Sequence, residues 1–125
     1  RIRAAIEATL ARYGIEVVPL YVLMAGRSGR EGQDIGPADV ARALAARGQR
    51  VSTSRPTPGD FVAAYRGRLA AGADRIVSVH LSAALSGTVE AAASAAAGSA
   101  AGSAHSRASV SRTSGLVKRS ISVRR

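Results

Sequence analysis

The chain has 125 residues, with 18 Lys and Arg against eight acidic residues and a formal net charge of +10 at pH 7. It contains no Cys and only two His, which lie far apart, so the composition excludes disulfides and argues against a metal site. The length gives room for one small domain, and no apolar run approaches the roughly 18 residues of a membrane-spanning helix, so we expect a cytoplasmic protein without a membrane span.

The first 36 residues predict a helix, a strand and a loop. Apolar side chains recur at helical spacing up to Gly14, a residue typical of the position after a helix, so residues 2–13 should form an amphipathic helix. Residues 15–24 are rich in β-branched side chains and predict a strand, with an edge or a bulge at Pro19, whose nitrogen cannot donate a hydrogen bond. Residues 25–36 contain four Gly and predict a loop.

Two further helices and a strand follow. Pro37 is typical of the first position of a helix, which Gly48 should end. Thr57 predicts the cap of the next helix, with Asp60 at its third position in a capping box. Residues 75–81 predict a buried strand. Because strands that alternate with helices of this length favour βαβ units, we expect an α/β fold with a parallel sheet and helices on both of its faces.

Two hydroxyl-rich segments stand out, VSTSRPTPGDF at residues 51–61 and VSVHLSAALSGT at residues 77–88. Each leads to a predicted helix start, where free backbone N–H groups and hydroxyls can hold a carboxylate or a phosphate. The second segment includes a strand end, beyond which ligands of α/β sheets bind. The pattern predicts a small-anion site, although the same residues would also serve as a turn at Thr53 and a helix cap at Ser86.

Together with YGIEVVPLYV and GQDIGPADV ahead of them, these segments resemble the first domain of the DegV family of bacterial fatty-acid-binding proteins. The first matches the pattern T-S-x-P-[ST]-P-G-[DE]-F and the second matches H-L-S-x-x-[LI]-S-G-T, at the spacing of the family. The resemblance implies a protein that holds a long-chain fatty acid by its carboxylate and needs no other cofactor. It also implies presentation of the bound acid to a separate fatty-acid kinase.

By position in these motifs, the resemblance assigns the carboxylate contacts to Thr53 and Ser86. The surrounding loops add four supporting residues, Ser54, Ser82, Gly87 and Thr88. Nothing at recognisable spacing completes a catalytic triad with the serines, and the Gly-rich loop lacks the ending of a P-loop. His80, near a strand end, fits a hydrogen-bonded core histidine better than a general base. We therefore expect no enzymatic activity.

The resemblance extends over about residues 6–92, and the expected domains are a partial DegV-like α/β lobe at 1–92 and a low-complexity basic tail at 93–125. Family members begin with a further strand and continue into a second domain, so the lobe is expected to be truncated at both ends. From residue 91 on, 22 of 35 residues are Ala, Ser or Gly, with six basic residues and no acidic one. Such a tail is expected to be disordered or translated out of frame.

The basic tail also supports two rival hypotheses. It could bind nucleic acid or an acidic surface, although no aromatic side chain follows Tyr65 and base stacking is therefore disfavoured. Alternatively, the chain is a nonfunctional fragment.

Overall fold

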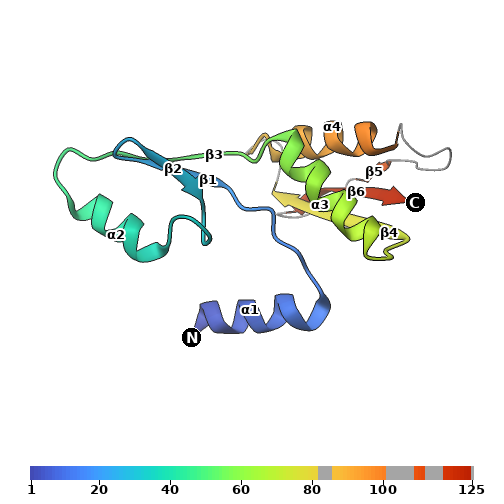
Figure 1. The fold of residues 1–125 in the computed structure, drawn as a ribbon, viewed down its shortest axis with the longest axis horizontal. Helices are drawn as coiled ribbons and strands as arrows, with labels where there is room; N and C mark the ends of the chain where they lie inside the picture. The colour runs from blue at the N-terminus through green and yellow to red at the C-terminus, as the bar shows by residue number, and fades with distance from the viewer. Residues whose placement is uncertain (82–85, 101–108, 112–116, 125) are drawn as a thin grey trace.

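The computed structural model describes residues 1–81, 86–100, 109–111 and 117–124, which form four helices and six strands. In chain order they are α1 (Ile2–Tyr13), β1 (Tyr21–Met24), β2 (Arg27–Arg30), α2 (Pro37–Ala45), β3 (Val51–Ser54), α3 (Pro58–Ala70), β4 (Arg75–Leu81), α4 (Thr88–Ala100), β5 (Ser109–Ser111) and β6 (Val117–Arg124). Two small sheets lie at opposite ends of the molecule, each with its own helices, and α1 lies apart from both (Figure 1).

The first sheet has the strand order β2-β1-β3, and both pairs are antiparallel. A tight turn at Ala25 and Gly26 joins β1 to β2, with φ of 46° and 74°, the left-handed values typical of two-residue hairpin turns. Helix α2 packs against this sheet through a cluster of Val22, Met24, Ile35 and Ala43. The stretch predicted as a loop therefore contains β2, whose sequence RSGR is polar and mostly exposed and so carries no apolar periodicity.

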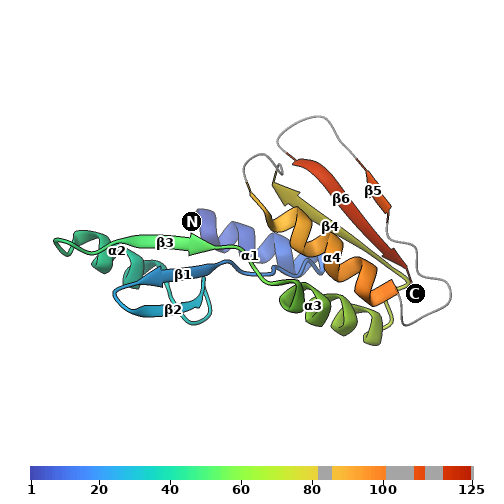
Figure 2. The ribbon, with the colours of Figure 1, turned by 90° about the horizontal axis from the view of Figure 1, so that it is seen from above.

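The second sheet has the order β4-β6-β5, again antiparallel, and α3 and α4 cover one of its faces (Figure 2). Phe61 and Tyr65 of α3 are buried against four alanines of α4, and Ile76 of β4 packs on the same cluster. Alanine side chains let the two helices approach closely. On the opposite face of β4, Val77 and Val79 are 67% and 64% exposed, so strand β4 buries one face only.

The α/β composition expected from the sequence is confirmed, but the strand pairing differs. Every strand pair among the described residues is antiparallel, and the helices of the described part cover each sheet on one face rather than two. Parallel pairing of β3 with β4 would need the α3 connection to bring them side by side. Instead β3 pairs with β1, on the side of β1 away from β2. Strand β4 pairs with β6, the last of the described strands.

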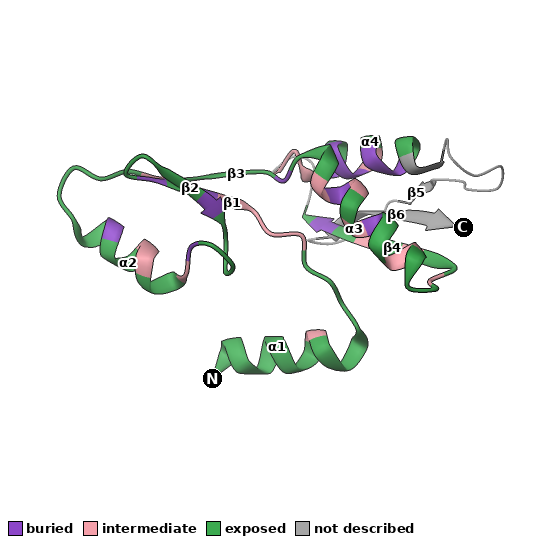
Figure 3. Cartoon of the chain, viewed as in Figure 1, coloured by how far each residue is buried: buried purple, intermediate pink, exposed green. Residues whose placement is uncertain are grey.

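Helix α1 has the predicted bounds, and its side chains are almost all exposed, including 80% of Ile2 (Figure 3). Gly14 ends it in a left-handed conformation with φ of 60°, and the Gly14 N–H points at carbonyls of the last turn. Residues 15–20 do not form a strand, so the strand expected over residues 15–24 is confined to β1, which begins two residues after Pro19. A proline there removes a ladder donor.

Helix α4 continues across residue 92, the predicted end of the lobe, and it is the buried Ala92, Ala95 and Ala96 that hold it against α3. Strands β5 and β6 lie in the segment predicted to be a low-complexity tail. Within the described residues, no helix has the length and apolar character needed to cross a bilayer. No cluster of His, Cys, Asp and Glu among them could hold a metal ion.

Candidate functional site

Thr53 and Ser54 close strand β3, at the edge of the first sheet. Thr53 pairs with the buried Val22 of β1, yet Thr53 itself is exposed. The Ser54 hydroxyl lies 3.5 Å from the carbonyl of Arg55, at the outer limit of a hydrogen bond. Thr53 and Ser54 are therefore both exposed at the point where the chain leaves the sheet toward α3.

The capping box predicted for α3 is confirmed and fixes the direction of this loop. The Asp60 N–H donates to the Thr57 hydroxyl oxygen at 3.2 Å, and the Thr57 N–H donates to the Asp60 carboxylate at 2.7 Å. Tyr21 of β1 donates its hydroxyl to the same carboxylate at 3.0 Å, which links the first sheet to α3. Burial opposes ionisation of Asp60, but these hydrogen bonds outweigh it and lower the pKa of the carboxyl below its usual value.

The second hydroxyl loop starts helix α4. The Ser86 hydroxyl lies 3.1 Å from the Thr88 hydroxyl and accepts from the Thr88 N–H at 3.4 Å, so Ser86 contacts the first residue of α4 from two positions ahead of it. Val89 is buried, with 1% exposed, and anchors this first turn. Ser82, the remaining supporting residue, lies outside the described residues.

Arg55 joins the two loops. Its Nη1 donates to the carbonyl oxygen of Gly87 at 3.2 Å, across 32 residues of sequence. A β-carbon at Gly87 would collide with this guanidinium, so the close approach depends on the glycine. The structure thus brings together the two segments that carry Thr53 and Ser86. Sequence reasoning named Gly87 but missed Arg55, whose signal was a basic residue inside a hydroxyl-rich motif.

His80 and Tyr65 lie in the core between α3 and β4. His80 is buried, its Nε2 is 2.7 Å from the Ser78 hydroxyl, and its ring makes an edge contact with Phe61 at 5.6 Å. Burial lowers the pKa of His80, so the imidazole is neutral at pH 7. The sequence prediction of a hydrogen-bonded core histidine is confirmed.

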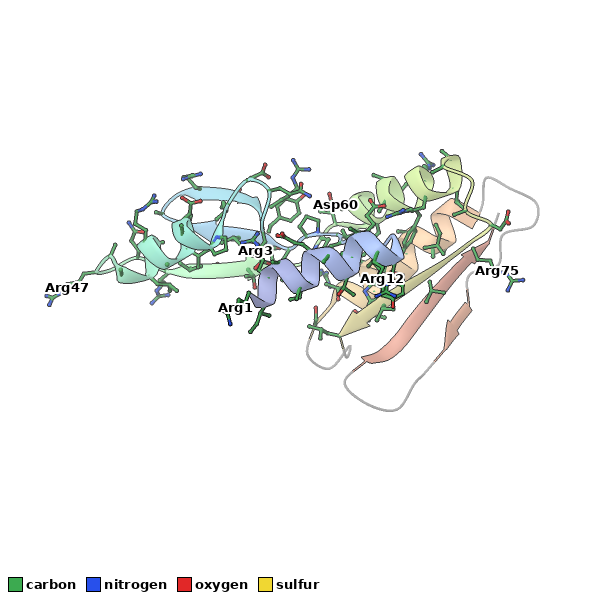
Figure 4. All side chains as sticks on the ribbon, turned by 90° about the horizontal axis from the view of Figure 1, so that it is seen from below. Arg1, Arg3, Arg12, Arg47, Asp60 and Arg75 are labelled. Carbon is green, nitrogen blue, oxygen red and sulfur yellow. The ribbon has the colours of Figure 1, made fainter. Side chains whose placement is uncertain are left out.

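Positive charge is spread over the described residues rather than gathered on one surface. Figure 4 shows the labelled arginines distributed from Arg47, at the tip beyond α2, to Arg75 at the start of β4. Four arginines, Arg3, Arg30, Arg42 and Arg68, form ion pairs with nearby carboxylates on the surface. The rival hypothesis of a nucleic-acid-binding tail concerns side chains outside those the structure describes.

Comparison with known proteins places these features in a family. Residues 4–113 match the family model described as "Uncharacterised protein, DegV family". A DegV domain-containing protein of Streptomyces coelicolor is 48% identical over 76 residues, which cover 61% of this chain and 27% of the relative. One from Listeria monocytogenes is 38% identical over 71 residues, covering 57% of this chain and 25% of the relative.

A solved structure is similar as well. It is described as fatty acid binding of a DegV family protein from Thermus thermophilus, and it matches with a TM-score of 0.65 and 38% sequence identity. The match covers 74% of this chain and 32% of the other. The chain thus spans about a quarter to a third of the relatives it matches. The family match also continues past residue 92, where the motif resemblance ended.

Proposed function

Because the chain belongs to the DegV family, we propose that it binds a long-chain fatty acid by its carboxylate, with Thr53 and Ser86 as the contacts. The observation that carries this proposal is the Arg55–Gly87 hydrogen bond, which brings the two hydroxyl loops together. The relative from Thermus thermophilus, described as fatty acid binding, is similar to this chain over 74% of this chain's length, which supports the proposal.

The chemistry of the two loops suits a carboxylate. An ionised carboxylate only accepts hydrogen bonds, and both loops offer donors: the hydroxyl of the exposed Thr53, the Ser86 hydroxyl and the first N–H groups of α4. The helix dipole adds positive potential at the same end. Ser54, Gly87 and Thr88 complete the loops around these donors.

We propose a binding role rather than catalysis for these residues. The only histidine among the described residues, His80, is buried, neutral and engaged with Ser78, which removes it as a general base. The hydroxyls near the site have no activating partner of the Ser–His kind within the described hydrogen bonds. In this proposal the bound acid is handed to a separate fatty-acid kinase, as the family resemblance implies.

Titration with a fluorescent fatty acid tests the proposal. Thr53→Val and Ser86→Ala should each weaken binding by about 1 to 3 kcal/mol, because a desolvated carboxylate loses a donor. Thr9→Val is a matched control, since the Thr9 hydroxyl bonds only within the exposed helix α1 among the described contacts. The methyl ester of the acid should bind more weakly than the free acid. Equal affinity for acid and ester would refute a carboxylate site.

A further inference from the structure

The contact between Arg55 and Gly87 lies at the beginning of α4. The Gly87 carbonyl oxygen accepts from Arg55 Nη1 at 3.2 Å and also from the Ala91 N–H at 3.5 Å, which belongs to the first turn of the helix. Arg55 therefore contacts the same end of α4 as the Ser86 hydroxyl does. Hydrogen bonds from a charged donor are roughly twice as strong as neutral ones, so this contact can hold two loops that nothing in local sequence joins.

Gly87 is what allows this approach. A β-carbon at position 87 would overlap Nη1 of Arg55 and lie 3.3 Å from Cδ and Cζ of the same side chain. The φ of Gly87 is not in the left-handed region, so the backbone itself would accept alanine. Substituting Gly87 would thus displace the guanidinium while leaving Arg55 in the chain.

The placement of the charge points to an anion nearby. A cation near the beginning of a helix is disfavoured by the helix dipole, because the free N–H groups there already carry partial positive charge. An arginine held at this end becomes favourable when an anion binds beside both. The guanidinium has five N–H donors in a planar fork, and the described contacts use one of them.

We infer that Arg55 is a positioning residue for the carboxylate site: it locks the loop of Thr53 against the loop of Ser86. This inference rests on the proposed function and adds to it a residue outside the hydroxyl pairs of the motifs. Arg55 acts through the two hydroxyl loops, by keeping both sets of donors within reach of one head group.

A double-mutant cycle tests whether the contact between Arg55 and Gly87 holds the two loops together. Arg55→Ala and Gly87→Ala should each weaken binding of a fluorescent long-chain fatty acid by about tenfold, which is the loss of one good hydrogen bond. The double variant should also lose about tenfold rather than a hundredfold, because each change breaks the same contact. Arg66→Ala, which removes an exposed arginine from α3, controls for the loss of charge and should leave affinity unchanged.

Two further readouts separate positioning from general stability. The preference for free acid over methyl ester should fall in Arg55→Ala, because the lost positioning affects the carboxylate contacts and not the alkyl chain. Urea unfolding of the same variants, without any ligand, measures whether the effects of the two substitutions on stability are coupled. Additive losses in binding, or an unchanged acid-to-ester preference, would overturn the inference.

The outcomes also distinguish this inference from the proposed function. If the unaltered chain fails to discriminate acid from ester, the proposed carboxylate site is wrong. In that case coupling between positions 55 and 87 in urea unfolding would still support the lock between the loops, and additive unfolding effects would overturn it.

Discussion

The three tyrosines of the chain should respond differently to loss of the hydroxyl group. Tyr65 is 3% exposed, and its hydroxyl is buried without a hydrogen-bond partner among the described residues. Burial raises the pKa of Tyr65, and the nearby Ser78 side chain opposes this shift to a lesser extent. The Ser78 hydroxyl lies 2.7 Å from His80 Nε2 and makes no hydrogen bond of standard geometry with the Tyr65 hydroxyl. Among the described residues, the Tyr65 hydroxyl is therefore buried without a hydrogen bond that compensates for its desolvation.

Tyr65→Phe should stabilise the chain. A buried polar group without a partner costs about 1 to 3 kcal/mol, and removing it gives that cost back. The void left by one oxygen is no larger than a methyl group and costs about 1 kcal/mol at most. The gain from removing the unpaired hydroxyl is larger than the cost of the void, so the free energy of unfolding should rise by about 1 kcal/mol.

Urea unfolding of three variants checks this reasoning. Tyr21→Phe should destabilise, because the Tyr21 hydroxyl donates to the Asp60 carboxylate at 3.0 Å. Tyr13→Phe should have no effect, because Tyr13 is 66% exposed. The order of stability should be Tyr65→Phe above Tyr13→Phe above Tyr21→Phe. A clear loss of stability in Tyr65→Phe would show that its hydroxyl is bonded and that the reasoning is wrong.

Two other changes follow from the capping box and from the buried histidine. Thr57→Ala should lower the free energy of unfolding by about 1 kcal/mol, because the Asp60 N–H loses its acceptor, and urea unfolding would measure it; no loss would mean that the cap does not stabilise α3. Since burial lowers the pKa of His80 in the folded chain, stability should be full above the usual value of 6.5 and should fall as the pH drops below it. Unfolding at pH 8 and pH 5.5 would show the difference, and His80→Gln should remove most of it. If the His80→Gln variant loses as much stability between pH 8 and pH 5.5 as the unaltered chain, other groups cause the pH dependence.

The helices could be read from the sequence because their signals are local. The bounds of α1 follow from apolar spacing and from Gly14, which needs no distant contact to adopt φ of 60°. The start of α3 follows from Thr57 and Asp60, three residues apart. Strand β2 shows the opposite case, since a β-carbon at its Gly29 would lie 2.8 Å from Asp34 Cβ and 3.1 Å from Ile35 Cγ1, a packing requirement set by later residues.

Strand pairing could not be read from the sequence in the same way. The alternation of strands and helices indicated βαβ units, but the pairing of β4 depends on β6, some 40 residues later in a segment of low complexity. Four buried alanines at the interface of α3 and α4 likewise carry little signal, because alanine is common in exposed helices too. Long-range pairing is decided by which surfaces meet, and a single sequence does not state that.

For the candidate site, the sequence predicted the hydroxyl residues but not the contact between their two loops. Thr53 lies in strand β3, near its end, and Ser86 precedes helix α4, and both belong to motifs that can be recognised within each segment. The Arg55 guanidinium reaches a carbonyl 32 residues away, and the local traces of this contact are a basic residue inside a hydroxyl-rich motif and the small size of Gly87. A residue that positions two loops gains its role from their meeting. Such residues are therefore found by looking for side chains that span motifs, after the motifs themselves have been placed.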